Sequence, residues 1–152
     1  MAKLTHAFSS EAGVIHKEHE DLLHYLAELD RALDHLQPGE PVSPDADAFG
    51  QVFLYGRLLG SGLPEHFLRE EQELLDTVAE VSPELREFAR EMKREHESLC
   101  VRVSDFCRAL GDVQYAENRP AALEGVHALG KQLTRELGRH IALEEQELSG
   151  FL

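Results

Sequence analysis

The chain has 152 residues, a length typical of one domain, and we expect residues 1–152 to form a single domain. Its 29 acidic and 15 basic residues give a formal net charge of −14, which argues against nucleic acid and anionic membrane surfaces as partners. The hydrophobic fraction is 42%, and no apolar run is long enough to cross a bilayer. The first residues also lack the apolar core of a signal peptide, so we expect a soluble, cytoplasmic protein.

Helix-breaking residues divide the chain into long periodic segments. Gln37–Pro41 ends the first segment, and Ser43-Pro44 supplies an N-cap and a first-turn proline for the second. Ser82-Pro83 does the same for the third, and Asn118–Pro120 opens the fourth. The short connections favour antiparallel neighbours, so we expect an all-α, up-down-up-down four-helix bundle made of two hairpins, about 10–80 and 83–148. The predicted helices lie near 10–36, 44–80, 83–110 and 120–148.

The second predicted helix contains the run Gly60–Pro64, with two glycines and a proline. Proline removes one backbone hydrogen bond and clashes with the preceding turn of a helix. We therefore expect a kink or a short break at this point.

Cys100 and Cys107 lie seven residues apart in the third predicted helix. At the helical rise their Cα atoms are roughly 10 Å apart, too far for a disulfide. We interpret them as small apolar residues on a helix face in a reducing compartment, with redox sensing as the alternative.

The apolar stripe of each predicted helix is interrupted by histidine or glutamate. The first and third stripes each contain one histidine at a position that is otherwise apolar. The second and fourth each contain a His-x-x-x-Glu pair, whose members lie one turn apart on one helix face. The six interruptions are His19, His66, Glu70, His96, His140 and Glu144.

These interruptions belong to an internal repeat. Residues 65–75 match residues 139–149 at six of eleven positions with an offset of 74. Residues 17–23 match residues 94–100 at four of seven positions with an offset of 77. The chain is therefore two similar helical hairpins. Within each hairpin the estimated heights of the two histidines differ by less than ~10 Å, so all six side chains can reach one level of the bundle.

The chemistry of this set favours a metal site. A buried carboxylate must be neutralised, paired or coordinated, and the stripes contain no lysine or arginine that could do so. Imidazole and carboxylate together suit iron, manganese or zinc. We expect a dinuclear site with His19 and His66 near one metal and His96 and His140 near the other. Carboxylates that project from facing helices can bridge two metals, the role expected for Glu70 and Glu144.

The ordered pattern His19, His66-x-x-x-Glu70, His96, His140-x-x-x-Glu144 resembles the hemerythrin-like (HHE cation-binding) domain family, over nearly the whole chain. The resemblance implies a non-haem di-iron centre with bridging carboxylates and a small oxygen-containing ligand such as dioxygen. It also implies two iron ions as the cofactor, and the donor chemistry leaves manganese or zinc as alternatives.

Two departures separate this chain from the oxygen-carrying hemerythrins that it resembles. Their third helix carries a His-x-x-x-His pair, whereas the positions one turn from His96 are Met92 and Cys100. Their fourth helix carries an aspartate at a longer spacing, where this chain has Glu144. The missing imidazole leaves a coordination position open or filled by water or another carboxylate. This difference favours reaction, sensing or iron handling over reversible oxygen carriage.

Several functions stay open at this point. The first is a di-iron protein that binds or reacts with dioxygen, peroxide or nitric oxide in a redox or sensing role, with an oxidase-like or peroxidase-like activity as one form of it. The alternative is a metal-dependent regulatory binding module or an iron-handling protein without catalysis. The sequence identifies no protein partner. Nor does it decide whether His16, Glu73 and Glu147 contact the metals, support the ligands or face solvent.

Overall fold

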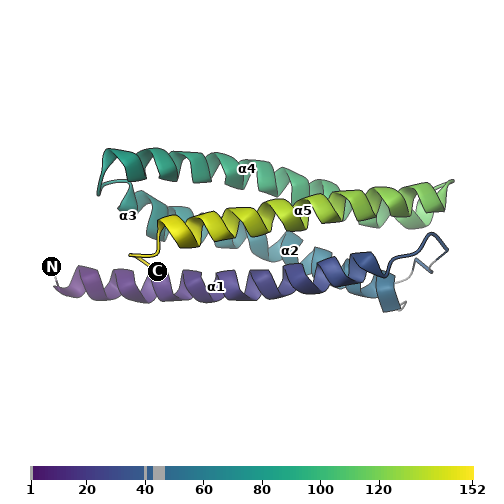
Figure 1. The fold of residues 1–152 in the computed structure, drawn as a ribbon, viewed down its shortest axis with the longest axis horizontal. Helices are drawn as coiled ribbons and strands as arrows, with labels where there is room; N and C mark the ends of the chain where they lie inside the picture. Colours follow the sequence, from purple (N-terminus) through teal and green to yellow (C-terminus); the bar gives the residue numbers. More distant parts are fainter. Residues whose placement is uncertain (1, 40, 43–46) are drawn as a thin grey trace.

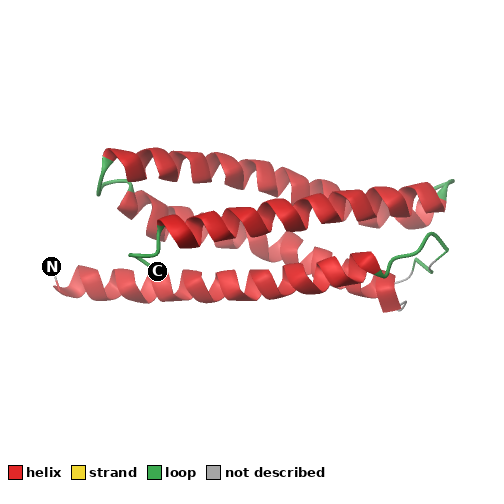
Figure 2. Cartoon of the chain, viewed as in Figure 1, coloured by secondary structure: helices red, strands yellow, loops and turns green. Residues whose placement is uncertain are grey.

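The computed structural model describes residues 2–39, 41–42 and 47–152, and side chains from Glu11 onward. The fold is built from four long helices packed side by side, with no strand in these residues (Figure 1). Figure 2 shows that the loops lie at the ends of the bundle, where they connect consecutive helices or follow the last one. The elements are α1 (Ala2–Asp34), α2 (Asp47–Glu70), the π-helical turn η1 (Glu71–Leu75), α3 (Asp76–Val78), α4 (Pro83–Asp112), the 3-10 turn η2 (Val113–Tyr115) and α5 (Arg119–Glu147).

The helices run alternately up and down, as predicted, so the start of α1 and the end of α5 lie at the same end of the bundle (Figure 1). α1 packs against α2 and α5, and α4 packs against the same two helices. This square arrangement gives every helix one face toward a common interior. None of the described helices is long and apolar enough to cross a membrane.

Two of the predicted helix starts are confirmed in atomic detail. The side chain of Ser82 accepts a hydrogen bond from the backbone N–H of Leu85 at 3.1 Å, and Pro83 occupies the first turn of α4. Asn118 caps α5 in the same way through the N–H of Ala121. In both cases the cap satisfies a backbone donor that has no partner within the helix. The predicted cap at Ser43-Pro44 lies outside the described residues.

Of the two irregularities expected at Gly60–Pro64, the break is absent, because α2 continues through Pro64 to Glu70. The kink stays a prediction. The lost hydrogen bond and the clash of the proline ring cost about 3 kcal/mol, which packing of the helix has to offset. The fully buried side chains of Leu59 and Leu63 and the buried Phe67 hold the helix against its neighbours across that point. The irregular turn comes later, as the π-helix Glu71–Leu75 directly after Glu70.

The first helix also differs from its prediction, since α1 begins at Ala2 rather than near residue 10. No proline or glycine interrupts residues 2–9, so nothing in the sequence stops the helix there.

The buried apolar residues form two clusters along the bundle. The larger cluster surrounds Phe106 and Leu133 on the side of the α1–α2 connection, and the smaller contains Ile15, Met92 and Leu148. In α1 the histidine at position 19 lies between Ile15 of the smaller cluster and Leu22 of the larger. The other helices repeat this order. The polar interruptions therefore form one layer between two hydrophobic clusters.

Candidate metal centre

The structure brings all six polar interruptions together at one level of the bundle interior. Each of these side chains is at most 3% exposed, and the two glutamates are fully buried. They come from all four long helices, and their ligating atoms fall into two groups that share Glu70. The groups are Glu70, His96, His140 and Glu144, and His19, His66 and Glu70.

The first group is centred on Nε2 of His96. This nitrogen lies 2.8 Å from Oε1 of Glu70 and 3.3 Å from Oε1 of Glu144. Nε2 of His140 lies 3.1 Å from it and contacts the same oxygen of Glu144. Two imidazole nitrogens and two carboxylate oxygens thus face one small volume.

The second group lies on the α1 and α2 side of the layer. Nε2 of His19 is 2.9 Å from Oε2 of Glu70, and Nε2 of His66 is 3.1 Å from the same oxygen. Glu144 also reaches toward this side, with its Oε2 3.6 Å from Nε2 of His19. Each glutamate therefore faces histidines of both groups with its two oxygens, the arrangement that a bridging carboxylate requires.

A second set of carboxylates contacts the outward-facing Nδ1 atoms of the histidines. Each pairing joins two different elements. In the pairs of His19, His66 and His140 a hydrogen bond fixes which imidazole nitrogen carries the proton and which faces the interior. The pairs are His19 with Glu145 at 2.8 Å, His66 with Glu18 at 2.7 Å, His140 with Glu95 at 2.6 Å, and His96 with Glu71 at 3.5 Å.

Sequence reasoning missed these four carboxylates, although the repeat contained the signal for them. Glu18 and Glu95 directly precede the histidines of α1 and α4, and Glu71 and Glu145 directly follow the buried glutamates. Within the described residues, Glu73 and Glu147 make no such contact with the six buried side chains. His16 is exposed and binds Glu145 at 3.0 Å, so it lies beside the pair formed with His19 rather than in the layer.

Phe67 is a further residue that the sequence did not single out. Its ring stacks on the imidazole of His96, with ring centres 3.9 Å apart and planes inclined by 8°. The edge of the His140 ring contacts the same phenyl group, at a centre distance of 5.6 Å. Phe67 therefore restrains both imidazoles of the first group by packing.

The buried charges share protons in this cluster. Burial lowers the pKa of His19, but the hydrogen bond and charge of Glu70 and the charge of Glu144 outweigh it and raise that pKa to about 9. Burial alone would raise the pKa of Glu70, yet the hydrogen bonds from His19, His66 and His96 hold it well below its usual range. Burial and the neighbouring charge of Glu70 raise the pKa of Glu144 well above its usual range. Of these two adjacent carboxyl groups, Glu70 therefore ionises at lower pH than Glu144.

Metal cations fit this set of donors. Within the described residues, four buried atoms of this cluster have a neighbour at ion-pair distance but no hydrogen bond of good geometry: His66 Nε2, Glu70 Oε1, His96 Nδ1 and Glu144 Oε2. Three of them face the interior of the layer. Buried polar atoms without hydrogen bonds are rare in native proteins because each costs desolvation free energy. A bound cation satisfies imidazole and carboxylate lone pairs at once.

Comparison with models of protein families identifies a family that matches this chain. The family model for the Hemerythrin HHE cation binding domain matches residues 10–152. Neither the curated proteins nor the solved structures contain a match to this chain.

Proposed function

Because the chain belongs to the hemerythrin HHE cation-binding family, we propose that the buried cluster binds two metal ions and that the native metal is iron. In this proposal His19 and His66 ligate one ion, and His96 and His140 ligate the other. Glu70 and Glu144 bridge the two. The observation that carries the proposal is the pair of donor groups sharing Glu70, all buried and drawn from four helices.

The donor chemistry supports the choice of metal. Four imidazoles with two carboxylates suit iron, manganese and zinc, and no cysteine belongs to the two donor groups found among the described residues. The side chains within ion-pair distance of the six are themselves histidines and glutamates. The cluster thus carries excess negative charge that only protons or cations can neutralise.

The function proposed for this centre is to bind or react with dioxygen, peroxide or nitric oxide, in a redox or sensing role. Six protein donors leave coordination positions on two ions for a small molecule. Bound iron would supply Lewis-acid and redox chemistry. The chain itself would hold the imidazoles through Glu18, Glu71, Glu95 and Glu145, and the apolar clusters on both sides would limit access of bulk water.

Metal analysis tests the first part of this proposal. The protein is loaded anaerobically with ferrous iron, desalted and analysed for metal, and we expect about two ions per chain, the stoichiometry of a carboxylate-bridged bundle site. The double variant His66→Ala/His140→Ala should lose most of this metal because each group loses a ligand. A matched control, His24→Ala/His35→Ala, changes two exposed histidines and should keep it. Equal metal content in both double variants would refute the site.

Exposure of the loaded protein to air, peroxide or nitric oxide tests the second part. We expect new near-ultraviolet and visible absorption from ligand-to-iron charge transfer. Repeated turnover of peroxide with a reductant would identify an enzyme, and binding without turnover would identify a carrier or a sensor. A spectrum that no gas or peroxide changes, at full iron content, would contradict this part.

A metal-dependent regulatory module is the second candidate function. It is favoured by the position of the layer, since six buried polar groups lie between two hydrophobic clusters and join all four helices. A ligand that binds only the folded state stabilises that state by mass action. The melting temperature should therefore rise on metal loading, and equal melting temperatures with and without metal would exclude a switch based on bundle stability.

A further inference from the structure

The two hairpins repeat the same pair of side chains at their outer faces. Glu18 on α1 accepts a hydrogen bond from Nδ1 of His66 on α2 at 2.7 Å. Glu95 on α4 accepts the equivalent bond from Nδ1 of His140 on α5 at 2.6 Å. The two pairs occupy corresponding positions of the internal repeat. A difference between their surroundings therefore distinguishes the His66 half of the cluster from the His140 half.

The surroundings of the two pairs differ in one decisive residue. Arg69 lies one helical turn after His66 on α2. It forms an ion pair with Glu18 and covers that carboxylate. The position 74 residues later holds Leu143, which offers no charge to Glu95. The exposed fraction of the side chain is 22% for Glu18 and 43% for Glu95. The first hairpin is therefore closed by a salt bridge that the second hairpin lacks.

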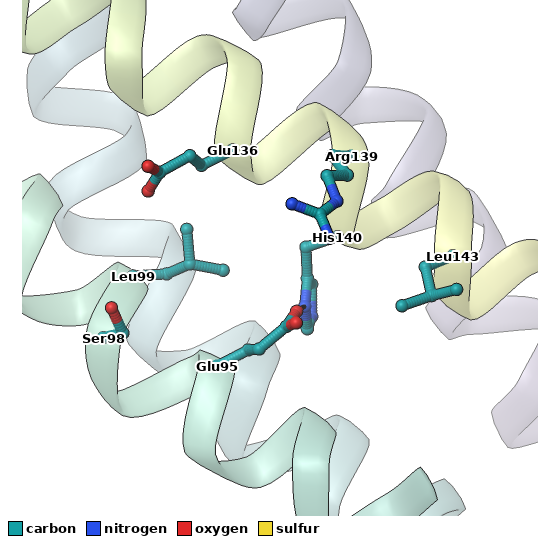
Figure 3. Close-up of a pocket in the computed structure, with 7 residues that line it drawn as sticks. All are labelled: Glu95, Ser98, Leu99, Glu136, Arg139, His140 and Leu143. Atoms are coloured by element: carbon teal, nitrogen blue, oxygen red, sulfur yellow. Dashed lines mark hydrogen bonds and ion pairs between the residues drawn. The ribbon is translucent and has the colours of Figure 1, made fainter.

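The second hairpin contains a pocket at this place. It has a volume of about 160 Å³ and lies between α4 and α5. Figure 3 shows Glu95 reaching from α4 to the imidazole of His140, with Leu99 and Leu143 on opposite sides of them. Ser98 lines the pocket from α4, and Arg139 and Glu136 line it from α5. His140, which is only 2% exposed, forms part of the wall.

We propose that this α4–α5 pocket is the route by which small molecules reach the His96 and His140 half of the cluster, while the Arg69–Glu18 ion pair closes the other half. The volume of about 160 Å³ accommodates small molecules up to about the size of benzene and therefore admits diatomic and triatomic ligands. Two carboxylates, Glu95 and Glu136, and one guanidinium group, that of Arg139, line the pocket, so its charges favour neutral molecules over anions. The choice of ligand rests on the proposed metal function, whereas the route to His140 does not.

A matched pair of variants tests the route. Ser98 is exposed and lines the pocket, and Asp21 is the exposed residue at the corresponding position of the first hairpin. In the iron-loaded protein, the rate of azide binding is measured by stopped-flow absorption in wild type, Ser98→Trp and Asp21→Trp. The indole at position 98 should slow binding by at least roughly tenfold, because association rates fall when the access path narrows. The Asp21→Trp variant should bind at the wild-type rate.

A second measurement uses the metal-free protein and does not depend on metal function. Deuterium exchange at the ring carbon between the two nitrogens of each histidine, followed by mass spectrometry, reports access of water to that ring. Ser98→Trp should slow exchange at His140 and leave His66 unchanged. Arg69→Leu, which copies Leu143 into the first hairpin, should accelerate exchange at His66 and leave His140 unchanged.

The outcomes separate the route from the function. If Ser98→Trp leaves both azide binding and exchange at His140 unchanged, or if Asp21→Trp slows azide binding as much as Ser98→Trp, the route is wrong. If the protein takes up no metal, the proposed function fails, and the exchange data alone then decide the route.

Discussion

The carboxylate of Glu145 on α5 accepts a hydrogen bond from Nδ1 of His19 on α1 at 2.8 Å. It joins the last long helix of the chain to the first. Glu71, at the corresponding position of the repeat, faces Nδ1 of His96 on α4 at 3.5 Å. Each hairpin thus supplies a carboxylate that supports a histidine of the other hairpin, so the two halves of the cluster depend on each other.

This relationship predicts the effect of removing Glu145. We expect Glu145→Ala to lower metal affinity by about 10- to 100-fold, because the partner that orients a ligating imidazole is lost. Glu147→Ala is the matched control, since that glutamate lies two residues further along, is exposed and makes no contact with the six buried side chains within the described residues. Competition with a chelator of known affinity measures both variants. An equal loss in both would show that general surface charge, rather than orientation, sets the affinity.

The shared protons predict a pH dependence for the metal-free protein. His19, faced by Glu70, Glu144 and Glu145, has its pKa raised from 6.5 to about 9, so its contribution to stability is complete below pH 6.5 and is lost as pH rises through 9. The raised pKa of Glu144 acts in the same direction. The folded state holds more protons than the unfolded state in this range, so the free energy of unfolding should fall with rising pH, by on the order of 3 kcal/mol for His19.

Urea unfolding of the metal-free protein at a series of pH values measures this loss. His19→Gln removes the titrating group and should flatten the dependence. A free energy of unfolding that stays constant or rises between neutral pH and pH 10 in the wild type would disprove the raised pKa.

Two glycines should tolerate alanine differently because of what surrounds them. A Cβ at Gly130 would lie 2.6 Å from Cδ1 of Leu33 and 3.0 Å from Cε2 of Phe106, whereas a Cβ at Gly125 meets no atom within 4 Å. Overpacking a filled core costs about 1–3 kcal/mol, more than alanine gains in helix propensity. We expect Gly130→Ala to destabilise the protein and Gly125→Ala to be neutral or stabilising. Thermal unfolding compares them, and a stabilised Gly130→Ala variant would contradict the close packing.

The cysteines should react slowly. Burial raises the pKa of both Cys100 and Cys107, and the thiol of Cys107 contacts the carbonyl oxygen of Gly56 at 3.3 Å. Both are free in the structure, as the sequence predicted. Because the thiolate is the reactive form, we expect both to react with an aromatic disulfide reagent more slowly than a small free thiol at neutral pH. Faster reaction than the free thiol would instead support redox sensing.

The sequence alone was sufficient for the four-helix fold and for the choice of the six buried polar residues. Both follow from patterns along one chain: apolar residues at helical spacing define the inner face, and a histidine or glutamate on that face has to be buried. A break at Pro64, one of the two outcomes expected there, is absent because the preference of a single residue is weaker than the packing of Leu59, Leu63 and Phe67 around it.

Only the tertiary structure decided which side chains support the imidazoles and which half of the cluster is accessible. Glu18, Glu95 and Glu145 lie outside the apolar stripes, so their contacts depend on how the helices face each other across the bundle. The same holds for Phe67, which stacks on an imidazole from another helix. The exchange of Arg69 for Leu143 is visible in the sequence, but its consequence, a covered glutamate in one hairpin and a pocket in the other, exists only where two packed helices meet.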